Sequence, residues 1–347
     1  TLITPDHFSK PSEVNSNDST LNGENILLYG VPGCGKSWTI ENEICKDVDE
    51  DHMERVVFHP DYSYGDFVGQ ILPRTYDDGQ IKYEFVPGPF TLILKEAYEK
   101  PSQMFYLVIE EINRGNAPAI FGDIFQLLDR REEDFDDFNK GTSVFSITNA
   151  DIADVVYKDK NHKVRIPSNL SIVATMNTSD QNVFTLDTAF QRRWNMRLIE
   201  NDLNDSKFEK EILDTGTKWN QFCNGINKFI IEINSATLSS EDKRLGAYFI
   251  KEEDYLLDET VYQEDASTKE KKEAEAHNNK FAEKVLKYLW DDAFKFDRDK
   301  VFDKNEVEIF TLESFVDEFN KPKKADRFSI FTNKARSYIV GLDEKSD

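Results

Sequence analysis

The chain has 347 residues, of which 66 are Asp or Glu and 43 are Lys or Arg, so its formal net charge is −23. Hydrophobic residues make up 39% and include 26 Phe, which excludes an acidic disordered chain and allows a sizeable core. The acidity disfavours a nucleic-acid-binding surface, because such a surface neutralises phosphates with Lys and Arg. At roughly 100–200 residues per domain, the length predicts two domains, or one large domain with an appendage.

Neither a membrane span nor a disulfide framework is expected. No apolar run approaches the roughly 20 residues that cross a bilayer. The three cysteines, Cys34, Cys45 and Cys223, form no CxxC pair, which also disfavours a zinc site. Residues 1–20 are polar and rich in Ser, Asn, Asp and Pro, and they predict a mobile leader. We therefore expect a cytoplasmic protein.

Short apolar strands alternate with helices up to about residue 200. Strands are expected at 25–30, 56–59, 105–109, 170–176 and 196–199, and helices at 36–45, 89–100, 117–131 and 186–192. The aromatic and turn residues of 62–88 predict an inserted hairpin or loop, and the alternating segments 143–148 and 163–167 are expected to pair as a second hairpin. The alternation of strands and helices predicts a parallel α/β sheet with helices on both faces.

The pattern beyond residue 200 is mainly helical. Helices are expected at 207–213, 219–235, 279–290 and 312–319, and the strongly charged stretch 251–278 predicts a loop or an exposed helix. We therefore predict three parts: the mobile leader over 1–20, an α/β domain over 21–200, and a smaller helical domain with a charged insertion over 201–347.

The strongest chemical signal lies between the first strand and the first helix. There the chain matches GxxxxGK[ST] and reads Gly30-Val31-Pro32-Gly33-Cys34-Gly35-Lys36-Ser37. Backbone N–H groups of such a loop converge on phosphate oxygens, and the helix that follows adds its positive dipole end. Lys36 is expected to reach the β- and γ-phosphates, and Ser37 to place its hydroxyl on Mg²⁺. A chance match is disfavoured by the strand and helix on either side.

Two carboxylates, Glu110 and Glu111, follow the apolar strand at 105–109. In P-loop NTPases the first carboxylate at such a strand end holds Mg²⁺, and the next one orients the attacking water. Glu110 stands where Asp is usual, and its extra methylene shifts the carboxylate by about one C–C bond. Glu111 is then the expected catalytic base. Two acids after a strand are more often a solvated strand end, but here they follow a P-loop.

Four motifs in order resemble AAA+ ATPases of the McrB and MoxR kind. Residues 110–114 read EEINR and resemble the family's DEINR, and 176–180 read MNTSD and resemble MNTAD of the McrB group. Residues 59–67 (HPDYSYGDF) resemble FHxSYSYEDF, and 186–194 (LDTAFQRRW) resemble DxALRRRF. The later segments 244–249 and 287–292 are only weakly similar to the family.

The resemblance implies roles for several further residues. Asn177 corresponds to sensor 1 and is implied to position water or contact the γ-phosphate. Arg192 and Arg193 occupy the place of the arginine finger, which reaches the nucleotide of the neighbouring subunit, and Arg114 is a second candidate for action in trans. Asp180 is implied in guanine recognition or water positioning, with a helix N-cap as the alternative.

Two functions are considered for the aromatic insert at 62–90. Its rings could stack on single-stranded nucleic acid, but only Arg74 and Lys82 are basic, against five acids between Asp61 and Glu84. Packing or subunit contact is therefore favoured.

The sequence as a whole predicts an AAA+ module that hydrolyses a nucleoside triphosphate with Mg²⁺, with GTP favoured and ATP as the alternative. The resemblance implies a homo-oligomeric ring, of which a hexamer is one form, acting with a McrC-like nuclease subunit in DNA restriction and anti-phage defence. DNA would be contacted mainly through that partner or through an N-terminal recognition domain outside this chain. The alternatives are a MoxR-like ATPase that remodels other proteins, and a nucleotide-gated assembly module with little hydrolysis.

Overall fold

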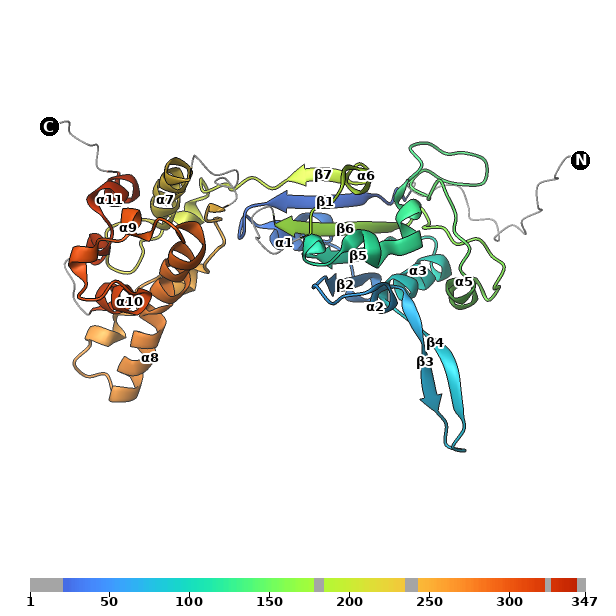
Figure 1. Ribbon diagram of the computed structural model, residues 1–347, viewed down its shortest axis with the longest axis horizontal. Helices are drawn as coiled ribbons and strands as arrows, with labels where there is room; N and C mark the ends of the chain where they lie inside the picture. The colour runs from blue at the N-terminus through green and yellow to red at the C-terminus, as the bar shows by residue number, and fades with distance from the viewer. Residues whose placement is uncertain (1–20, 178–183, 235–242, 322–325, 342–347) are drawn as a thin grey trace, which may run out of the picture.

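The computed structural model describes residues 21–177, 184–234, 243–321 and 326–341. The predicted leader at 1–20 and the predicted site residue Asp180 lie outside these ranges. Two bodies are visible in Figure 1, one built on a central sheet and the other on helices.

The sheet has five strands in the order β2-β5-β6-β1-β7, and every pairing in it is parallel. The strands are β1 Asn25–Gly30, β2 Met53–Val57, β5 Phe105–Glu110, β6 Leu170–Asn177 and β7 Asn195–Leu198. The three inner strands are nearly continuous apolar runs because both of their faces are covered. The predicted parallel α/β architecture is confirmed.

Alternate residues of the inner strands enter different cores, as the period of two requires. Leu27 packs in a large core with residues of α3 Pro89–Glu99, α4 Ala117–Phe121 and α5 Ala150–Tyr157. Its neighbour Leu28 packs in a smaller core with Ile40, which lies in the π-helical continuation of α1 Lys36–Thr39. Helices therefore cover both faces of the sheet.

The predicted insert is a β-hairpin that projects from the sheet body (Figure 1). It follows the short helix α2 Tyr64–Phe67 and pairs β3 Gly69–Thr75 with β4 Ile81–Pro87 in antiparallel register. Ser63 begins α2 with a capping box that includes Asp66. The face that carries Ile71, Ile81 and Tyr83 is exposed, so the outer part of the hairpin adds little to the core.

A second core draws its buried residues from Leu203 to Ile339, whereas the sheet cores use residues up to Ile199. The predicted boundary at residue 200 falls between the two sets. The longer helices of this part are α7 Trp219–Ile233, α8 Thr268–Asn278, α10 Leu312–Asn320 and α11 Asn333–Val340, and α9 Arg298–Val301 is a single turn. The predicted helix at 279–290 consists mainly of two π-helical segments, Ala282–Leu286 and Leu289–Ala293. Among the described residues, no helix is both long and apolar enough to cross a membrane.

Several local predictions were wrong. The expected helix at 207–213 is only the 3₁₀ turn Ser206–Glu209, and the second hairpin is reduced to one bridge between Ile147 and Val164. Asn149 caps α5 between those two segments, so the chain there forms a helix instead of a tight turn. The edge strand β2 runs 53–57 instead of 56–59, and α6 is the single turn Thr188–Gln191.

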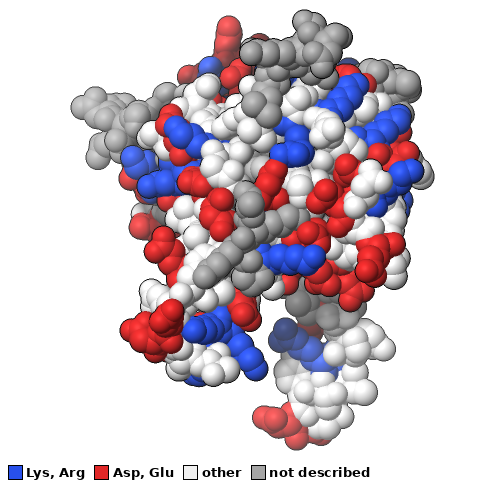
Figure 2. Space-filling model, turned by 90° about the vertical axis from the view of Figure 1, so that its left-hand side faces the viewer, with Lys and Arg blue, Asp and Glu red and all other residues white. Residues whose placement is uncertain are grey.

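Figure 2 views the molecule from the helical end and shows acidic side chains interspersed with basic ones over this face. Part of the acidity is matched locally: Asp254 is ion-paired with Lys280 and Lys284. The hydrogen bonds that the two lysine ammonium groups donate to Asp254 lower the pKa of its carboxyl. Such mixing of charges is typical of a solvated surface.

Arg130 joins the beginning of β1 to the loops around β6. Its guanidinium donates to the carbonyls of Gly141, Pro167 and Leu170 and to the Asn25 side chain, at 2.7–3.3 Å. One side chain thus ties the loop at Gly141 to the adjacent beginnings of β1 and β6.

We expect Arg130→Met to lower the free energy of unfolding by about 3 kcal/mol, because the substitution keeps the apolar stem but leaves buried carbonyls without a donor. Chemical denaturation of the purified protein measures this. Arg74→Met on the exposed hairpin is the control and should change stability by less than about 0.5 kcal/mol. Equal effects of the two substitutions would contradict the assigned role of Arg130.

Candidate nucleotide site

Three predicted segments meet at one edge of the sheet because their strands are parallel and adjacent. β1 ends at Gly30, which pairs with Asn177 at the end of β6, and β5 ends at Glu110 beside it. The phosphate loop, the two carboxylates and the predicted sensor asparagine therefore share the carboxyl edge. Ligands of open α/β sheets bind at this edge.

The phosphate loop has the backbone shape that its glycines allow. Gly33 and Gly35 have φ of 75° and 107°, a region that side chains with a Cβ rarely adopt. The buried Lys36 begins α1, and its Nζ donates to the carbonyls of Gly30 and Val31 at 3.0 and 3.1 Å. The lysine is thus placed inside the loop, where a phosphate would meet its ammonium group.

Glu110 is held by donors from three different elements. Its carboxylate accepts from Ser37 Oγ at 3.3 Å, from Thr175 Oγ1 at 3.1 Å and from Arg55 Nη1 at 2.9 Å. The Ser37 hydroxyl and the Glu110 carboxylate are hard oxygen ligands, the kind that Mg²⁺ prefers, so this pair fits a magnesium site. Sequence reasoning missed Arg55, because only the pairing of β2 with β5 brings it to Glu110.

Glu111 adopts a left-handed backbone conformation, with φ of 55° and ψ of 46°. Such a conformation costs about 1–3 kcal/mol for a residue other than glycine and is concentrated at functional sites. The Thr175 hydroxyl accepts from the backbone N–H of Glu111, and Asn177 Nδ2 donates to both carboxylate oxygens at 2.7 and 2.9 Å. Two neighbouring strands therefore fix the expected base and the expected sensor against each other.

Further contacts support this pair. Arg114 Nε approaches a Glu111 oxygen to 3.2 Å, and Asn113 Nδ2 donates to the Asn177 carbonyl at 2.8 Å. Arg114, predicted as a second trans candidate, thus lies beside Glu111 of its own chain. Its side chain is half exposed.

A segment of the helical part, residues 244–249, lies directly on the phosphate loop. The backbone N–H groups of Gly246 and Tyr248 donate to the carbonyls of Pro32 and Gly33, at 3.1 and 2.8 Å. A Cβ on Gly33 would come within 2.8 Å of the Phe249 backbone, so glycine is required there by contact as well as by φ. The weak family similarity of 244–249 was the only sequence signal for this contact.

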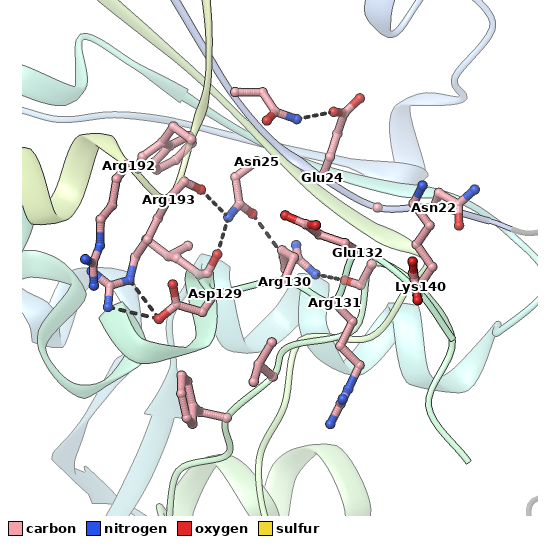
Figure 3. A pocket seen from close by; sticks show the side chains of 18 residues that line it. Asn22, Glu24, Asn25, Asp129, Arg130, Arg131, Glu132, Lys140, Arg192 and Arg193 are labelled. Atoms are coloured by element: carbon pink, nitrogen blue, oxygen red, sulfur yellow. Dashed lines mark hydrogen bonds and ion pairs between the residues drawn. The ribbon is translucent and has the colours of Figure 1, made fainter. Parts of the chain in front are cut away.

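The two predicted finger arginines lie at the opposite edge of the sheet, where β1 and β7 begin. They line a pocket of about 1030 Å³ that is shown in Figure 3. Arg193 is held there: it pairs with Asp129 at 2.9 Å, donates to the Ala189 carbonyl at 2.7 Å and stacks over Phe125. Arg192 is exposed, and its guanidinium has no ion pair or hydrogen bond with the described residues.

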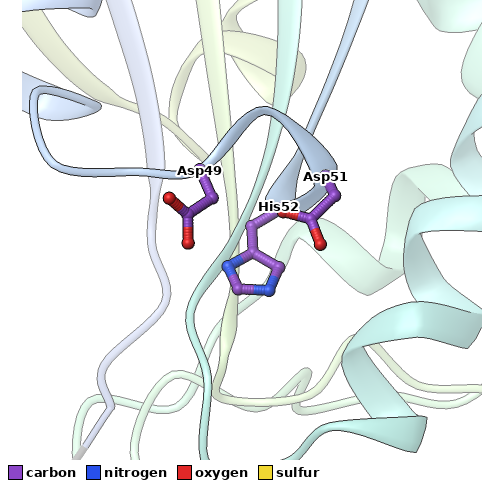
Figure 4. A group of neighbouring side chains, drawn as sticks. All are labelled: Asp49, Asp51 and His52. Atoms are coloured by element: carbon purple, nitrogen blue, oxygen red, sulfur yellow. The ribbon is translucent and has the colours of Figure 1, made fainter.

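One group of possible metal ligands lies away from the carboxyl edge that carries the phosphate loop. Asp49, Asp51 and His52 gather at the turn before β2, with one ligand atom from each within 4.8 Å of the others (Figure 4). The two aspartates are exposed, and the His52 ring packs edge-on against Phe105. We assign no function to this group.

Comparison with known proteins agrees with the α/β fold of the sheet body. Residues 25–194 match the AAA domain (dynein-related subfamily). The chain is 34% identical over 304 residues to the "Type II restriction enzyme BsuMI component YdiS" of Bacillus subtilis (strain 168), covering 78% of this chain and 79% of that protein. The chain belongs to the McrB-like AAA+ family.

A second relative of this McrB-like AAA+ protein is more distant. This chain is 26% identical over 237 residues to the "Type IV methyl-directed restriction enzyme EcoKMcrB subunit" of Escherichia coli (strain K12). That match covers 65% of this chain but only 47% of the relative. The chain thus spans about half the length of the second relative and most of the first.

The different contacts of Arg192 and Arg193 in this McrB-like protein allow their contributions to stability to be measured separately. Arg193→Ala should lower the free energy of unfolding by about 1–3 kcal/mol, because it removes a largely buried ion pair and leaves Asp129 alone. Arg192→Ala should change stability by less than about 0.5 kcal/mol. Thermal and chemical denaturation of both variants test this. If Arg192→Ala is the more destabilising of the two, the assigned contacts are wrong.

Proposed function

We propose that this McrB-like protein hydrolyses a nucleoside triphosphate, with GTP favoured, as the motor subunit of a restriction system. The observation that carries the proposal is the contact of Asn177 with both oxygens of Glu111, beside the phosphate loop. A carboxylate that is fixed in position on a strained backbone, next to the proposed triphosphate site, is suited to orient water. Membership of the family supports the same reading.

In the proposed mechanism the phosphate loop and Lys36 hold the triphosphate. Ser37 and Glu110 would hold Mg²⁺, which neutralises charge on the phosphate oxygens when bound. Glu111 accepts a proton from water, whose oxygen attacks the γ-phosphorus as the bond to the β-phosphate oxygen breaks. Asn177 holds Glu111 and the water in line, so loss of either residue should affect the chemical step more than binding.

The arginine pair supports activity in an assembly. Arg192 and Arg193 lie at the opposite end of the strands from the phosphate loop of their own chain, so they cannot complete that site. We propose that Arg192 reaches the nucleotide of a neighbouring copy, while Arg193 positions it. The favoured assembly is a ring, acting with a McrC-like nuclease on DNA that is contacted mainly through that partner. The names of the two relatives, both restriction-enzyme components, support this setting.

We expect Glu111→Gln to reduce turnover of GTP or ATP by at least about a hundredfold, because the amide cannot accept the proton. Binding of the nucleotide should stay within about threefold of the unchanged protein. Single-turnover hydrolysis and equilibrium binding measure the two effects. The exposed Glu283→Gln is the control for the charge change. Retained turnover would remove Glu111 from its proposed role, and an assembled ring that turns over neither nucleotide would overturn the hydrolase proposal.

Mixing variants tests the action in trans. Lys36→Ala and Arg192→Ala should each abolish turnover alone, and mixed assemblies should regain part of it, because some interfaces then combine an intact loop with an intact arginine. Turnover is measured across mixing ratios, with sizing of the assemblies as a control. If mixing restores no activity in assemblies of normal size, the trans geometry is wrong.

A further inference from the structure

Two exposed aromatic rings lie beside the phosphate loop. Trp38 directly follows Ser37 in α1, and Tyr248 belongs to the segment of the helical part that contacts the loop. The rings are nearly parallel, with an interplanar angle of 16° and centroids 6.4 Å apart. Trp38 is 45% and Tyr248 39% exposed, so much of this aromatic surface is open to a ligand.

The position of Tyr248 is fixed by the loop itself. Its backbone N–H donates to the Gly33 carbonyl at 2.8 Å, and its ring would be 3.1 Å from a Cβ on Gly35. The aromatic pair therefore lies next to the proposed position of the triphosphate. The ribose and base of the nucleotide must extend from that position.

A lysine lies over both rings. Lys207 Nζ is 4.8 Å from the Tyr248 centroid and 5.7 Å from that of Trp38. It donates to the Tyr248 hydroxyl at 2.7 Å and pairs with Asp205 at 3.0 Å. The hydrogen bond to Tyr248, followed by that to Asp205, raises the pKa of Lys207. An ammonium group has three N–H donors, and these two partners use two of them.

We propose that Trp38 and Tyr248 stack on the nucleobase and that Lys207 selects guanine over adenine. Aromatic rings bind any base through its π-face, so the pair supplies affinity without selectivity. Guanine places two acceptors, O6 and N7, side by side, and the remaining N–H of Lys207 can be shared between them. Adenine places the N6 amino donor beside N7, so the same ammonium would face a donor. The inference rests on the proposed nucleotide site and extends it to the base.

The test measures binding without turnover. GTP, ATP and ITP compete with a fluorescent triphosphate for Glu111→Gln protein, which is not expected to consume them. ITP keeps O6 and N7 but lacks the 2-amino group, so it should bind within about threefold of GTP. Lys207→Met should weaken GTP and ITP about tenfold while changing ATP by less than about twofold. Trp38→Ala should weaken all three nucleotides about tenfold, because stacking does not distinguish the bases.

Two further variants complete the test. Lys210→Met is the matched control, because Lys210 is exposed on the same segment and lies outside the aromatic pair, so it should leave all three affinities unchanged. Tyr248→Phe keeps the ring but removes the hydroxyl that holds Lys207, and it should reduce the preference for GTP. Thermal denaturation confirms that each variant is folded.

The outcomes separate this inference from the proposed function. An unchanged GTP-to-ATP ratio in folded Lys207→Met, or ITP that binds as weakly as ATP, would overturn guanine selection by Lys207. Trp38→Ala that lowers thermal stability but leaves all three affinities unchanged would show that the rings only join the two bodies, and would overturn the stacking role. Loss of turnover in the unsubstituted assembly, with these binding patterns intact, would instead overturn the hydrolase proposal alone.

Discussion

The structure depends on one constraint, the parallel pairing of β5, β6 and β1. Parallel neighbours end at the same edge of a sheet, so residues more than 60 positions apart meet there without any long side chain having to span the gap. Thr175 illustrates this: its hydroxyl contacts the Glu110 carboxylate and accepts from the Glu111 N–H. The neighbouring strand thereby holds Glu111 in a backbone conformation that it would not adopt alone.

The same constraint places the arginine pair far from the phosphate loop. A residue before β7 lies at the beginning of β1, and the loop lies at its end, so the two are separated by the length of the strand. The ion pair with Asp129 and the stacking on Phe125 hold Arg193 at that end, next to the exposed Arg192. With the role proposed for Arg192, the site would be completed by a second copy of the chain.

The net charge of −23 bears on where DNA would be contacted. The face in Figure 2 mixes both signs of charge, and on the projecting hairpin Arg74 is ion-paired with Glu84 of β4. Neither surface has the concentrated positive charge with which proteins bind the phosphates of nucleic acids. This distribution of charge supports the proposal that DNA is contacted mainly through a partner. The exposed apolar face of the hairpin is better suited to a protein contact.

Motifs made the sheet and much of the site predictable from the sequence. The phosphate loop, Glu110, Glu111 and Asn177 are each contiguous with a strand whose apolar run is readable, and parallel order then brings them together. Short elements were less predictable: residues 207–213 form only a 3₁₀ turn, and the cap at Asn149 replaced an expected hairpin with α5. Local propensity is weak over so few residues, and tertiary contacts decide the outcome.

The sequence by itself determined the class of fold and the residues that end each strand. Only the tertiary structure decided which side chains surround them. Arg55 reaches Glu110 from a neighbouring strand, Tyr248 reaches the loop from the other body, and Lys207 lies over both aromatic rings. Their partners are 55, 215 and 169 positions apart in the chain, in the pairs Arg55–Glu110, Gly33–Tyr248 and Trp38–Lys207. No local pattern encodes contacts at such separations, because they arise from how whole strands and bodies pack.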